Sequence, residues 1–296
     1  MAKKLRLGIL GMSEGNGHPY SWSAIFNGYD PKEMAKCEFK VIPEYLAKQS
    51  WPKDCLDGAE VTHVWTQDKL VSNDIAHAAL IPNIVENMED LIGKVDAILL
   101  ARDDADNHGV MAIPFLKAGL PVYIDKPLAF CEEDAAAMFN AEQYEGQLFS
   151  CSAMRFATEL YLTEDEKKLL GKLKFIQAQI SKSWDKYAVH ILEPIIAGNC
   201  DRGLLKKVTV LKNHSITKAQ VSWENLEAEV STFGEYAVPL RITYFGEGNH
   251  IQKDFTRTFD AFKASLGDFI KSIHHKELTI PREETIEIVK IIELGR

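Results

Sequence analysis

The first half of the chain alternates short apolar runs with amphipathic stretches, and this alternation restricts the fold more than any other feature. The apolar runs predict strands, and the stretches that follow have helical periodicity. The expected strands are Leu5–Leu10, Val61–Trp65, Val95–Ala101, Pro121–Ile124 and Gln147–Cys151, and the expected helices are Tyr20–Phe26, Lys69–Leu80, Asn107–Ala118 and Glu132–Tyr144. Such repetition predicts a parallel sheet with right-handed crossovers, whose ligands bind outside the carboxyl ends of the strands.

The second half has a different pattern, with strands that follow one another and few helices between them. Its expected strands are Lys172–Ser181, Lys206–Lys212, Gln220–Trp223 and Val238–Phe245, followed by helices over Thr256–Ile273 and Glu283–Leu294. This order favours a largely antiparallel sheet. We therefore predict an α/β domain over residues 1–153 and an α+β domain over residues 154–296. Residues 30–59 contain three prolines and lack clear periodicity, so they are predicted to form an insertion with a short hairpin or helix.

Composition narrows the classes of partner. The 296 residues are 46% hydrophobic and 26% charged, which is typical of a globular protein, and the net charge of -9 provides no general basic surface for nucleic acid or anionic lipid. Five cysteines without a C-x-x-C pair predict neither a zinc cluster nor a disulfide framework, and they favour a reducing cytoplasm. Residues 1–10 lack the features of a signal peptide, and no apolar run is long enough to span a membrane. The chain ends at Arg296 within a helical pattern, which leaves room for a missing C-terminal strand or tail.

A glycine-containing loop joins the first expected strand to the first expected helix. Such a loop can offer backbone N–H groups to a phosphate. The loop departs from the G-x-G-x-x-G pattern because Ser13 and Asn16 replace the second and third glycines, and a flexible turn is about as well supported as a pyrophosphate site. Glu14 would oppose a pyrophosphate if it pointed inward. The candidate cofactor contacts in this loop are Gly11, Ser13, Asn16, Gly17 and His18.

The end of the second expected strand carries the candidates for a ribose contact. Thr66 or Asp68 can take this role, but a helix N-cap explains Asp68 equally well. An acid at Asp68 slightly favours NAD, whereas the neighbouring Lys69 can tolerate the 2′-phosphate of NADP.

Charged residues also follow the strand that ends at Ala101. Arg102 is placed where a dinucleotide would lie and is a candidate cofactor contact. For Asp103 and Asp106 we favour a solvated loop, with Asp106 as the N-cap of the next helix.

Lys126 directly follows an apolar strand and precedes a proline, which stiffens the backbone at this point. Its ammonium can meet a substrate at the carboxyl edge of the sheet. Spacing alone favours a solvated surface lysine over a catalytic one.

Several motifs, taken in order, resemble the Gfo/Idh/MocA superfamily, named for glucose-fructose oxidoreductase and inositol dehydrogenase. They are Gly8–Gly11, Val95–Ala97, His108 with Lys117–Gly119, Asp125–Ala129, Met154–Phe156, Gly171–Leu173 and Tyr187–Glu193. The resemblance implies an N-terminal Rossmann domain that binds NAD or NADP. It also implies a C-terminal domain whose open sheet supports substrate binding and the contacts of a homodimer or homotetramer.

The resemblance also implies roles for individual residues. Lys126 matches the lysine of the family's Glu-Lys-Pro motif, with Asp125 in place of the glutamate, and His190 matches a histidine that commonly acts as acid or base. Lys186 lies four positions before His190, where the family has an acidic residue. Glu193 lies three positions after His190. We therefore expect Lys126, His190 and Asp125 to be catalytic. The expected substrate contacts are Lys186, Glu193 and Arg155, and His108 is a further expected cofactor contact.

These residues predict hydride transfer between a nicotinamide cofactor and a secondary alcohol or ketone of a sugar, cyclitol or sugar derivative. His190 would take the hydroxyl proton, and Lys126 would stabilise the developing oxyanion. Lys186 would lower the pKa of its neighbours or contact an acidic substituent. Two alternatives remain: a non-catalytic dinucleotide sensor on the same scaffold, and a metal-dependent hydrolase using His190 and Glu193. The hydrolase lacks further ligands at suitable spacing, so no metal is predicted.

Overall fold

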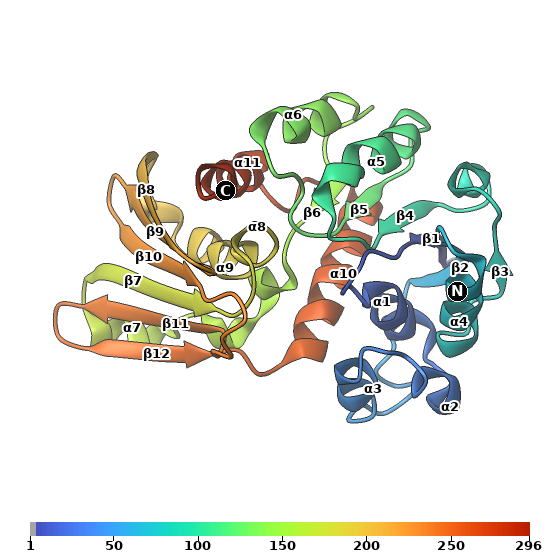
Figure 1. Ribbon diagram of the computed structural model, residues 1–296, viewed down its shortest axis with the longest axis horizontal. Coiled ribbons are helices and arrows are strands. Elements are labelled where there is room, and N and C mark those ends of the chain that lie inside the picture. The colour runs from blue at the N-terminus through green and yellow to red at the C-terminus, as the bar shows by residue number, and fades with distance from the viewer. Residues whose placement is uncertain (1–3) are drawn as a thin grey trace. The chain divides into compact units, whose positions relative to one another are not determined.

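The computed structural model describes residues 4–296, which form two compact units, each containing a six-stranded sheet (Figure 1). The first unit comprises residues 4–128, 134–150 and 262–280, and the second comprises residues 129–133, 151–261 and 281–296. Residues 1–3, which belong to the segment predicted to lack a signal peptide, lie outside the described residues. No helix in residues 4–296 is long and apolar enough to cross a membrane.

The sheet of the first unit is parallel throughout, as predicted, with the strand order β3-β2-β1-β4-β5-β6. This is the order of a Rossmann sheet, and it reverses direction between β1 and β4, where such folds bind their ligands. Strands β4 to β6 are fully buried, because helices cover both faces of the sheet. The strands are β1 (Leu5–Leu10), β2 (Ala59–Trp65), β3 (Asn83–Ile84), β4 (Ala97–Leu100), β5 (Val122–Ile124) and β6 (Leu148–Ser150).

Helices α1 and α4 lie on one side of this sheet, and α5 and α6 lie on the other (Figure 1). These helices are α1 (His18–Asn27), α4 (Lys69–Ala78), α5 (His108–Lys117) and α6 (Glu132–Asn140), with 3-10 turns at Met88–Leu91 and Ala105–Asn107. The predicted insertion over residues 30–59 contains two short helices, α2 (Pro31–Met34) and α3 (Val41–Leu46).

A segment from near the end of the chain completes the first unit. Helix α10 (Thr258–His275) contributes its residues from 262 onward, although the sequence analysis grouped all residues after 153 together. Its Phe269 is fully buried, with its ring centroid 5.5 Å from that of Tyr123 and 5.6 Å from that of Phe149. Trp22 of α1 adds to this aromatic cluster, 4.7 Å from Tyr123. Whether residues 1–153 form an independently folding domain stays a prediction.

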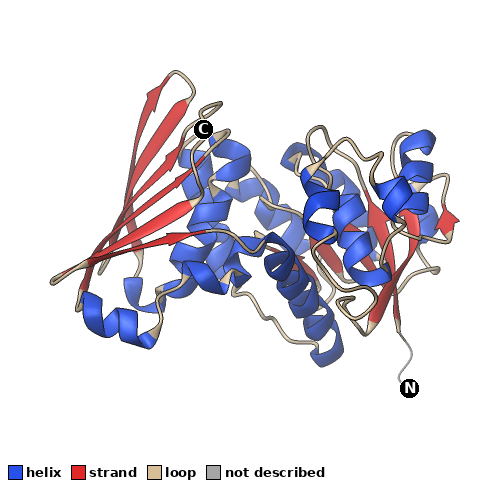
Figure 2. Cartoon of the chain, turned by 90° about the horizontal axis from the view of Figure 1, so that it is seen from below, coloured by secondary structure: helices blue, strands red, loops and turns tan. Residues whose placement is uncertain are grey.

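The second unit contains a mostly antiparallel sheet, as predicted, with the order β12-β11-β7-β10-β9-β8 and one parallel pair, β7 with β10. Helices lie on one face of this sheet (Figure 2). Strand β9 shows the resulting alternation, with Ala219 and Val221 buried and Lys218 and Gln220 exposed. The strands are β7 (Leu173–Ile180), β8 (Leu205–Asn213), β9 (Ile216–Trp223), β10 (Glu227–Thr232), β11 (Arg241–Gly246) and β12 (His250–Asp254). The helices are α7 (Glu164–Leu170), α8 (Trp184–Tyr187), α9 (Val189–Gly198) and α11 (Arg282–Leu294), with 3-10 turns at Ala153–Phe156, Thr158–Leu160 and Cys200–Arg202.

Candidate functional site

The loop between β1 and α1 brings the helix unusually close to the strand. A Cβ atom at Gly11 would lie 2.3 Å from Cγ of Pro19, so only glycine permits this approach. Gly17 is the N-cap residue of α1, and the N–H of His18 is already bound by the side-chain oxygen of Asn16 at 2.8 Å. The first turn of the helix therefore offers few free donors to an anion.

The turn before the helix has more free backbone N–H groups than the first turn of the helix. The N–H of Asn16 donates to the carbonyl of Ser13 at 3.2 Å, which leaves Glu14 and Gly15 exposed at the tip. Within residues 4–296, the backbone N–H groups of Ser13, Glu14 and Gly15 have no hydrogen-bond partner. Successive N–H groups of this kind suit phosphate oxygens. The loop thus fits a pyrophosphate through its backbone, although its glycine pattern is atypical.

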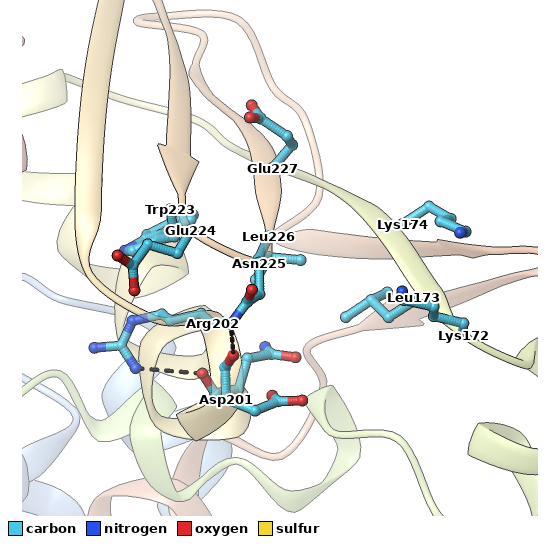
Figure 3. Close-up of a pocket in the computed structure, with 11 residues that line it drawn as sticks. Lys172, Leu173, Lys174, Asp201, Arg202, Trp223, Glu224, Asn225, Leu226 and Glu227 are labelled. Atoms are coloured by element: carbon cyan, nitrogen blue, oxygen red, sulfur yellow. Dashed lines mark hydrogen bonds between the residues drawn. The ribbon is translucent and has the colours of Figure 1, made fainter.

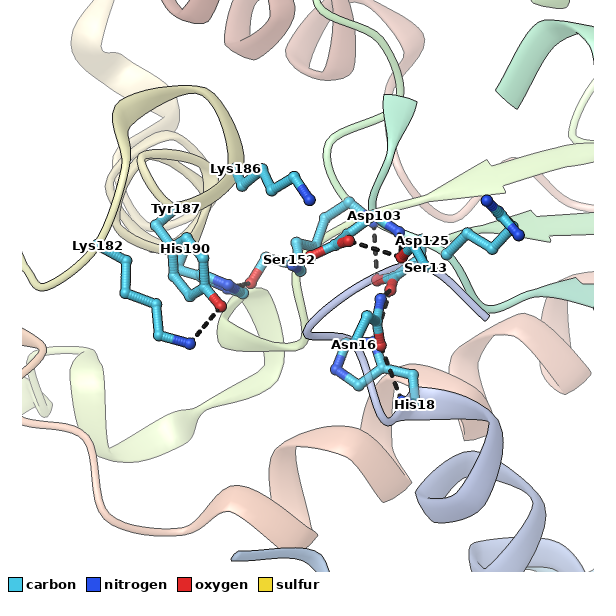
Figure 4. A network of polar contacts seen from close by, with 12 residues as sticks. Ser13, Asn16, His18, Asp103, Asp125, Ser152, Lys182, Lys186, Tyr187 and His190 are labelled. Carbon is cyan, nitrogen blue, oxygen red and sulfur yellow. Dashed lines mark hydrogen bonds and ion pairs between the residues drawn. The ribbon is translucent and has the colours of Figure 1, made fainter. Parts of the chain in front are cut away.

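The polar side chains of the loop are held by two buried carboxylates (Figure 4). Ser13 Oγ donates to Asp103 Oδ1 at 2.8 Å and accepts from the N–H of Asp103 at 3.0 Å. Asn16 Nδ2 donates to Asp125 Oδ2 at 2.7 Å, and His18 Nδ1 lies 2.5 Å from the same oxygen. These three predicted phosphate ligands therefore fix the loop to the ends of β4 and β5.

The burial of Asp103 contradicts one prediction, and Asp103 was not among the predicted site residues. We expected a solvated loop residue, but Asp103 is only 3% exposed. Its Oδ2 lies 3.4 Å from Nζ of Lys126, which is itself 4% exposed. A buried ammonium requires such an anionic partner. The prediction of a surface lysine from spacing alone is also wrong, since Lys126 is interior.

Asp125 is buried between three groups that bind its charged form. Besides His18 and Asn16, the backbone N–H of Lys126 donates to its Oδ1 at 2.8 Å. Burial by itself raises the pKa of Asp125, but the charges of His18 and Lys126 and the hydrogen bond from His18 outweigh it, so the pKa lies below its usual value. Asp125 is therefore an anion that joins the loop to the lysine.

The end of β2 shows one of the two roles that the sequence left open for Asp68. Asp68 Oδ1 accepts the N–H of Leu70 at 2.8 Å and so caps α4. Thr66 is buried, its hydroxyl donating to the carbonyl of Asp68 at 2.5 Å. The cap is therefore present at Asp68, and a ribose role for Thr66 or Asp68 stays a prediction.

Gln67, which the sequence analysis did not single out, lies between these two residues and reaches the phosphate loop. Its amide binds Met12 twice, accepting from the N–H at 3.1 Å and donating to the carbonyl at 2.6 Å. Arg102 Nη1 donates to both the Gln67 side chain and the Met12 carbonyl at 3.0 Å. The sequence gives only a weak signal for Gln67, a polar side chain two residues after the end of β2.

The segment after β4 differs from the prediction in its capping. Asp106 is exposed and makes no cap, because a 3-10 turn precedes α5 and moves the helix start to His108. The Asp104 carboxylate instead accepts hydrogen bonds from Arg102 Nε at 2.8 Å and from Asn107 Nδ2 at 2.7 Å. Burial raises the pKa of Asp104, but these hydrogen bonds and the Arg102 charge lower it below its usual value. His108 is fully buried between the carbonyls of Arg102 and Leu128, at 2.9 and 3.0 Å.

In the second unit, Ser152 joins two predicted site residues (Figure 4). Its hydroxyl lies 2.7 Å from His190 Nδ1, and its backbone N–H donates to Glu193 Oε1 at 3.2 Å. Ser152 Oγ also accepts the N–H of Met154 at 3.2 Å, which fixes its orientation. Ser152 was not predicted as a site residue, because a serine before a short turn carries no distinctive signal.

Glu193 forms an interior ion pair with Arg155, whose Nε lies 2.9 Å from its Oε2. Arg155 also binds Glu284 of α11. Burial raises the pKa of Glu193, and the Arg155 charge and the hydrogen bonds from Ser152 and Arg155 only partly offset this. Both predicted substrate contacts, Glu193 and Arg155, are thus bound to each other, and Lys186 lies on α8 one helical turn before His190.

A separate cavity of about 730 Å³ lies at one end of the second sheet (Figure 3). It is lined by charges of both signs, including Lys172, Asp201 and Glu224. Arg202 is already bound there to Glu287 at 3.1 Å and to two carbonyls. Among residues 4–296, no group of three His, Cys, Asp or Glu side chains is placed to hold a metal ion.

Comparisons with known proteins agree with this geometry. Residues 44–152 match the Gfo/Idh/MocA family model, described as an oxidoreductase family with an NAD-binding Rossmann fold. No curated protein sequence matches the chain.

Solved structures that are similar over nearly the whole chain include dehydrogenases. A probable dehydrogenase from Thermotoga maritima is 14% identical with a TM-score of 0.69, covering 99% of this chain and 98% of the other. A myo-inositol 2-dehydrogenase from Lactobacillus plantarum is 14% identical with a TM-score of 0.67, covering 98% and 96%. GenD2 from gentamicin A biosynthesis, solved in complex with NAD, is 11% identical with a TM-score of 0.69, covering 100% and 94%. At these identities the likeness shows the two-domain fold.

Proposed function

We propose that this chain, whose residues 44–152 match the Gfo/Idh/MocA oxidoreductase family, is an NAD-dependent dehydrogenase that acts on a secondary alcohol or ketone of a sugar or cyclitol. One observation carries the proposal. Lys126 is an interior lysine at the carboxyl end of β5, paired with Asp103 and joined through Asp125 to the loop at the switch point of the sheet. The dehydrogenases of similar fold, one of them named for myo-inositol, support the substrate class.

The backbone N–H groups of Ser13, Glu14 and Gly15 would hold the pyrophosphate of NAD, and Gln67 with Arg102 would meet its ribose and phosphate oxygens. The nicotinamide, when bound, supplies hydride transfer. His108 keeps the segment after β4 in place by binding two carbonyls. We propose NAD rather than NADP, in keeping with the NAD-binding description of the family.

We propose catalytic roles for Lys126 and His190. Lys126 would stabilise the negative charge that develops on the substrate oxygen, and Asp125 and Asp103 hold its backbone and ammonium in place. His190 would exchange a proton with the substrate hydroxyl through Nε2, since Ser152 binds its Nδ1. Glu193 accepts the backbone N–H of Ser152 and is itself bound by Arg155. We therefore propose that both residues hold Ser152 in position. We further propose a cytoplasmic enzyme that assembles as a homodimer or homotetramer through its second sheet.

The test measures NADH binding by fluorescence and then NADH absorbance changes across a panel of sugars and cyclitols. We expect turnover by the wild type, with Lys126→Met and His190→Asn each lowering kcat at least a hundredfold. Lys117→Met and His214→Asn alter an exposed lysine and an exposed histidine and serve as controls. Unchanged kcat in both site variants would refute their roles.

The atypical loop favours one alternative, a dinucleotide sensor without catalysis. NADH binding without turnover across the whole panel would support the sensor. Absence of NADH binding would reject both functions.

A further inference from the structure

Lys182, at the end of β7, has a backbone conformation that is rare for lysine. Its φ of 72° lies in the left-handed region, where a residue with a Cβ atom is strained. Two hydrogen bonds maintain it: the N–H of Lys182 donates to Gly234 O at 2.6 Å, and the N–H of Gly234 donates to Lys182 O at 2.9 Å. Gly234 is required at this bridge, because its φ is 55° and a Cβ there would lie 2.4 Å from that of Ser215. The second unit therefore fixes this lysine at the cost of strain.

The ammonium of Lys182 contacts Tyr187, whose ring neighbours that of His190, the proposed proton-exchanging residue. Lys182 Nζ lies 2.7 Å from the hydroxyl of Tyr187 and 4.6 Å from the centre of its ring (Figure 4). The ring of Tyr187 is in turn 5.3 Å from that of His190. An ammonium has three N–H donors, and Tyr187 accepts only one of them. Within residues 4–296, no carboxylate forms an ion pair with Lys182.

Other charged residues lie close to His190 in the sequence. Lys186 stands one helical turn before His190 on the adjoining helix. Asp185 is the acid nearest to it in sequence, and its Oδ1 accepts the N–H of Lys186 at 2.9 Å. Glu193, one turn after His190, is bound to Arg155. The exposed charge beside Tyr187 is that of Lys182.

We propose that the substrate carries an anionic oxygen group, a carboxylate or a phosphate, and that Lys182 binds it while His190 faces the neighbouring hydroxyl. The Tyr187 hydroxyl accepts a hydrogen bond from the ammonium and so orients it. Strained backbone residues cluster at functional sites, and here the strain fixes the backbone of a lysine with which no carboxylate of residues 4–296 forms an ion pair. This inference rests on the proposed function, because it places the substrate at His190.

The test uses two pairs of compounds that differ mainly in charge: D-glucose with D-glucuronate, and myo-inositol with myo-inositol 1-phosphate. Calorimetric titration measures their binding to the full chain, with and without NAD. We expect the wild type to bind at least one anionic compound about tenfold more tightly than its neutral partner, as a charged hydrogen bond provides. Selective binding of glucuronate identifies a carboxylate, and selective binding of the inositol phosphate identifies a phosphate.

Three variants test whether Lys182 causes the preference for the anionic compound. Lys182→Gln is expected to abolish the preference for the anionic compound, and Lys218→Gln, which alters an exposed lysine of β9, is expected to retain it. Lys182→Gly also removes the ammonium but is compatible with the left-handed backbone, so it should fold with a Tm no lower than that of the wild type. A wild type that binds charged and neutral partners equally, or a preference that survives Lys182→Gln, would overturn the inference. Because binding is measured without turnover, this outcome is distinct from a failure of NADH binding or catalysis.

Discussion

Two buried carboxylates show how local partners, and not burial alone, set the charge of a site residue. Asp125 and Glu193 are almost equally buried, with 1% and 2% of their surface exposed. The pKa of Asp125 is lowered despite its burial because His18, Asn16 and a backbone N–H all bind its oxygens. The pKa of Glu193 is raised, because burial outweighs the Arg155 charge. The two residues should therefore affect stability in opposite directions as pH changes.

Asp125→Asn should lower the free energy of unfolding by roughly 3 kcal/mol at neutral pH, because it removes the buried carboxylate that Asn16, His18 and a backbone N–H bind. The folded pKa of Asp125 is below its unfolded value of 3.8, so its contribution is complete above that pH and is lost as pH falls through the folded pKa. Urea unfolding at several pH values should thus show the two proteins converging in acid. The control is Asp106→Asn, at an exposed aspartate. A difference that does not change with pH would contradict this account.

Glu193→Gln should show the reverse trend. The folded pKa of Glu193 is above its unfolded value of 4.5, so its stabilisation is complete below that pH and declines as pH rises through the folded pKa. The wild type should therefore lose stability relative to the glutamine variant as pH rises above 4.5, by about 1.4 kcal/mol for each unit of pKa shift. Thermal unfolding in a series of buffers measures this trend. Constant or increasing relative stability would show that Arg155 outweighs burial.

The sequence predicted charged residues of the candidate site but not their partners. Lys126 and His190 were identified from ordered motifs, whereas Asp103 was placed in solvent and Ser152 was not noticed. Both form contacts with residues far away in sequence, Asp103 with Ser13 and Ser152 with His190. A local sequence pattern does not report such pairs, because the fold alone brings these residues together.

At the scale of elements, the approach of α1 to β1 sets the shape of the loop that would hold NAD. We predict that Gly11→Ala lowers the free energy of unfolding by about 2 kcal/mol, because its methyl group would overlap the Pro19 ring and displace the helix. NADH binding should weaken in the same variant. Gly109→Ala is the matched control, since a Cβ there meets nothing within 4 Å and alanine favours a helix. Normal stability of Gly11→Ala by urea unfolding would show that the loop relaxes freely.

The elements that the sequence predicted share a strong apolar period, and several of the strands that it missed do not. Strand β1 and helix α5 carry continuous or periodic apolar residues, and both were predicted to within about a residue of their bounds. Strand β3 has only two residues, and β12 is a polar edge strand. Strand β10 begins with acids and was missed, although it is the parallel partner of β7. Short or polar strands are defined by pairing with neighbours, which a local pattern does not report.

At the scale of the whole molecule, the first unit depends on a segment more than a hundred residues away in sequence. Residues 262–280 complete its aromatic cluster, where Phe269 packs on Tyr123 and Phe149, and Phe262 meets the edge of the His18 ring at 5.0 Å. A fragment ending near residue 153 would leave these apolar surfaces exposed. The predicted domain of residues 1–153 should therefore be insufficient to fold by itself.

We predict that a fragment of residues 1–153 shows no cooperative thermal transition by circular dichroism, although it contains every strand of the parallel sheet. In the full chain, Phe269→Ala should lower the free energy of unfolding by about 4 kcal/mol, since the ring is fully buried. Phe255→Ala, at a partly exposed phenylalanine, should cost much less. Sharp unfolding of the fragment would show that the strands and the first four major helices suffice, and that residues 262–280 only add to a core that is already complete.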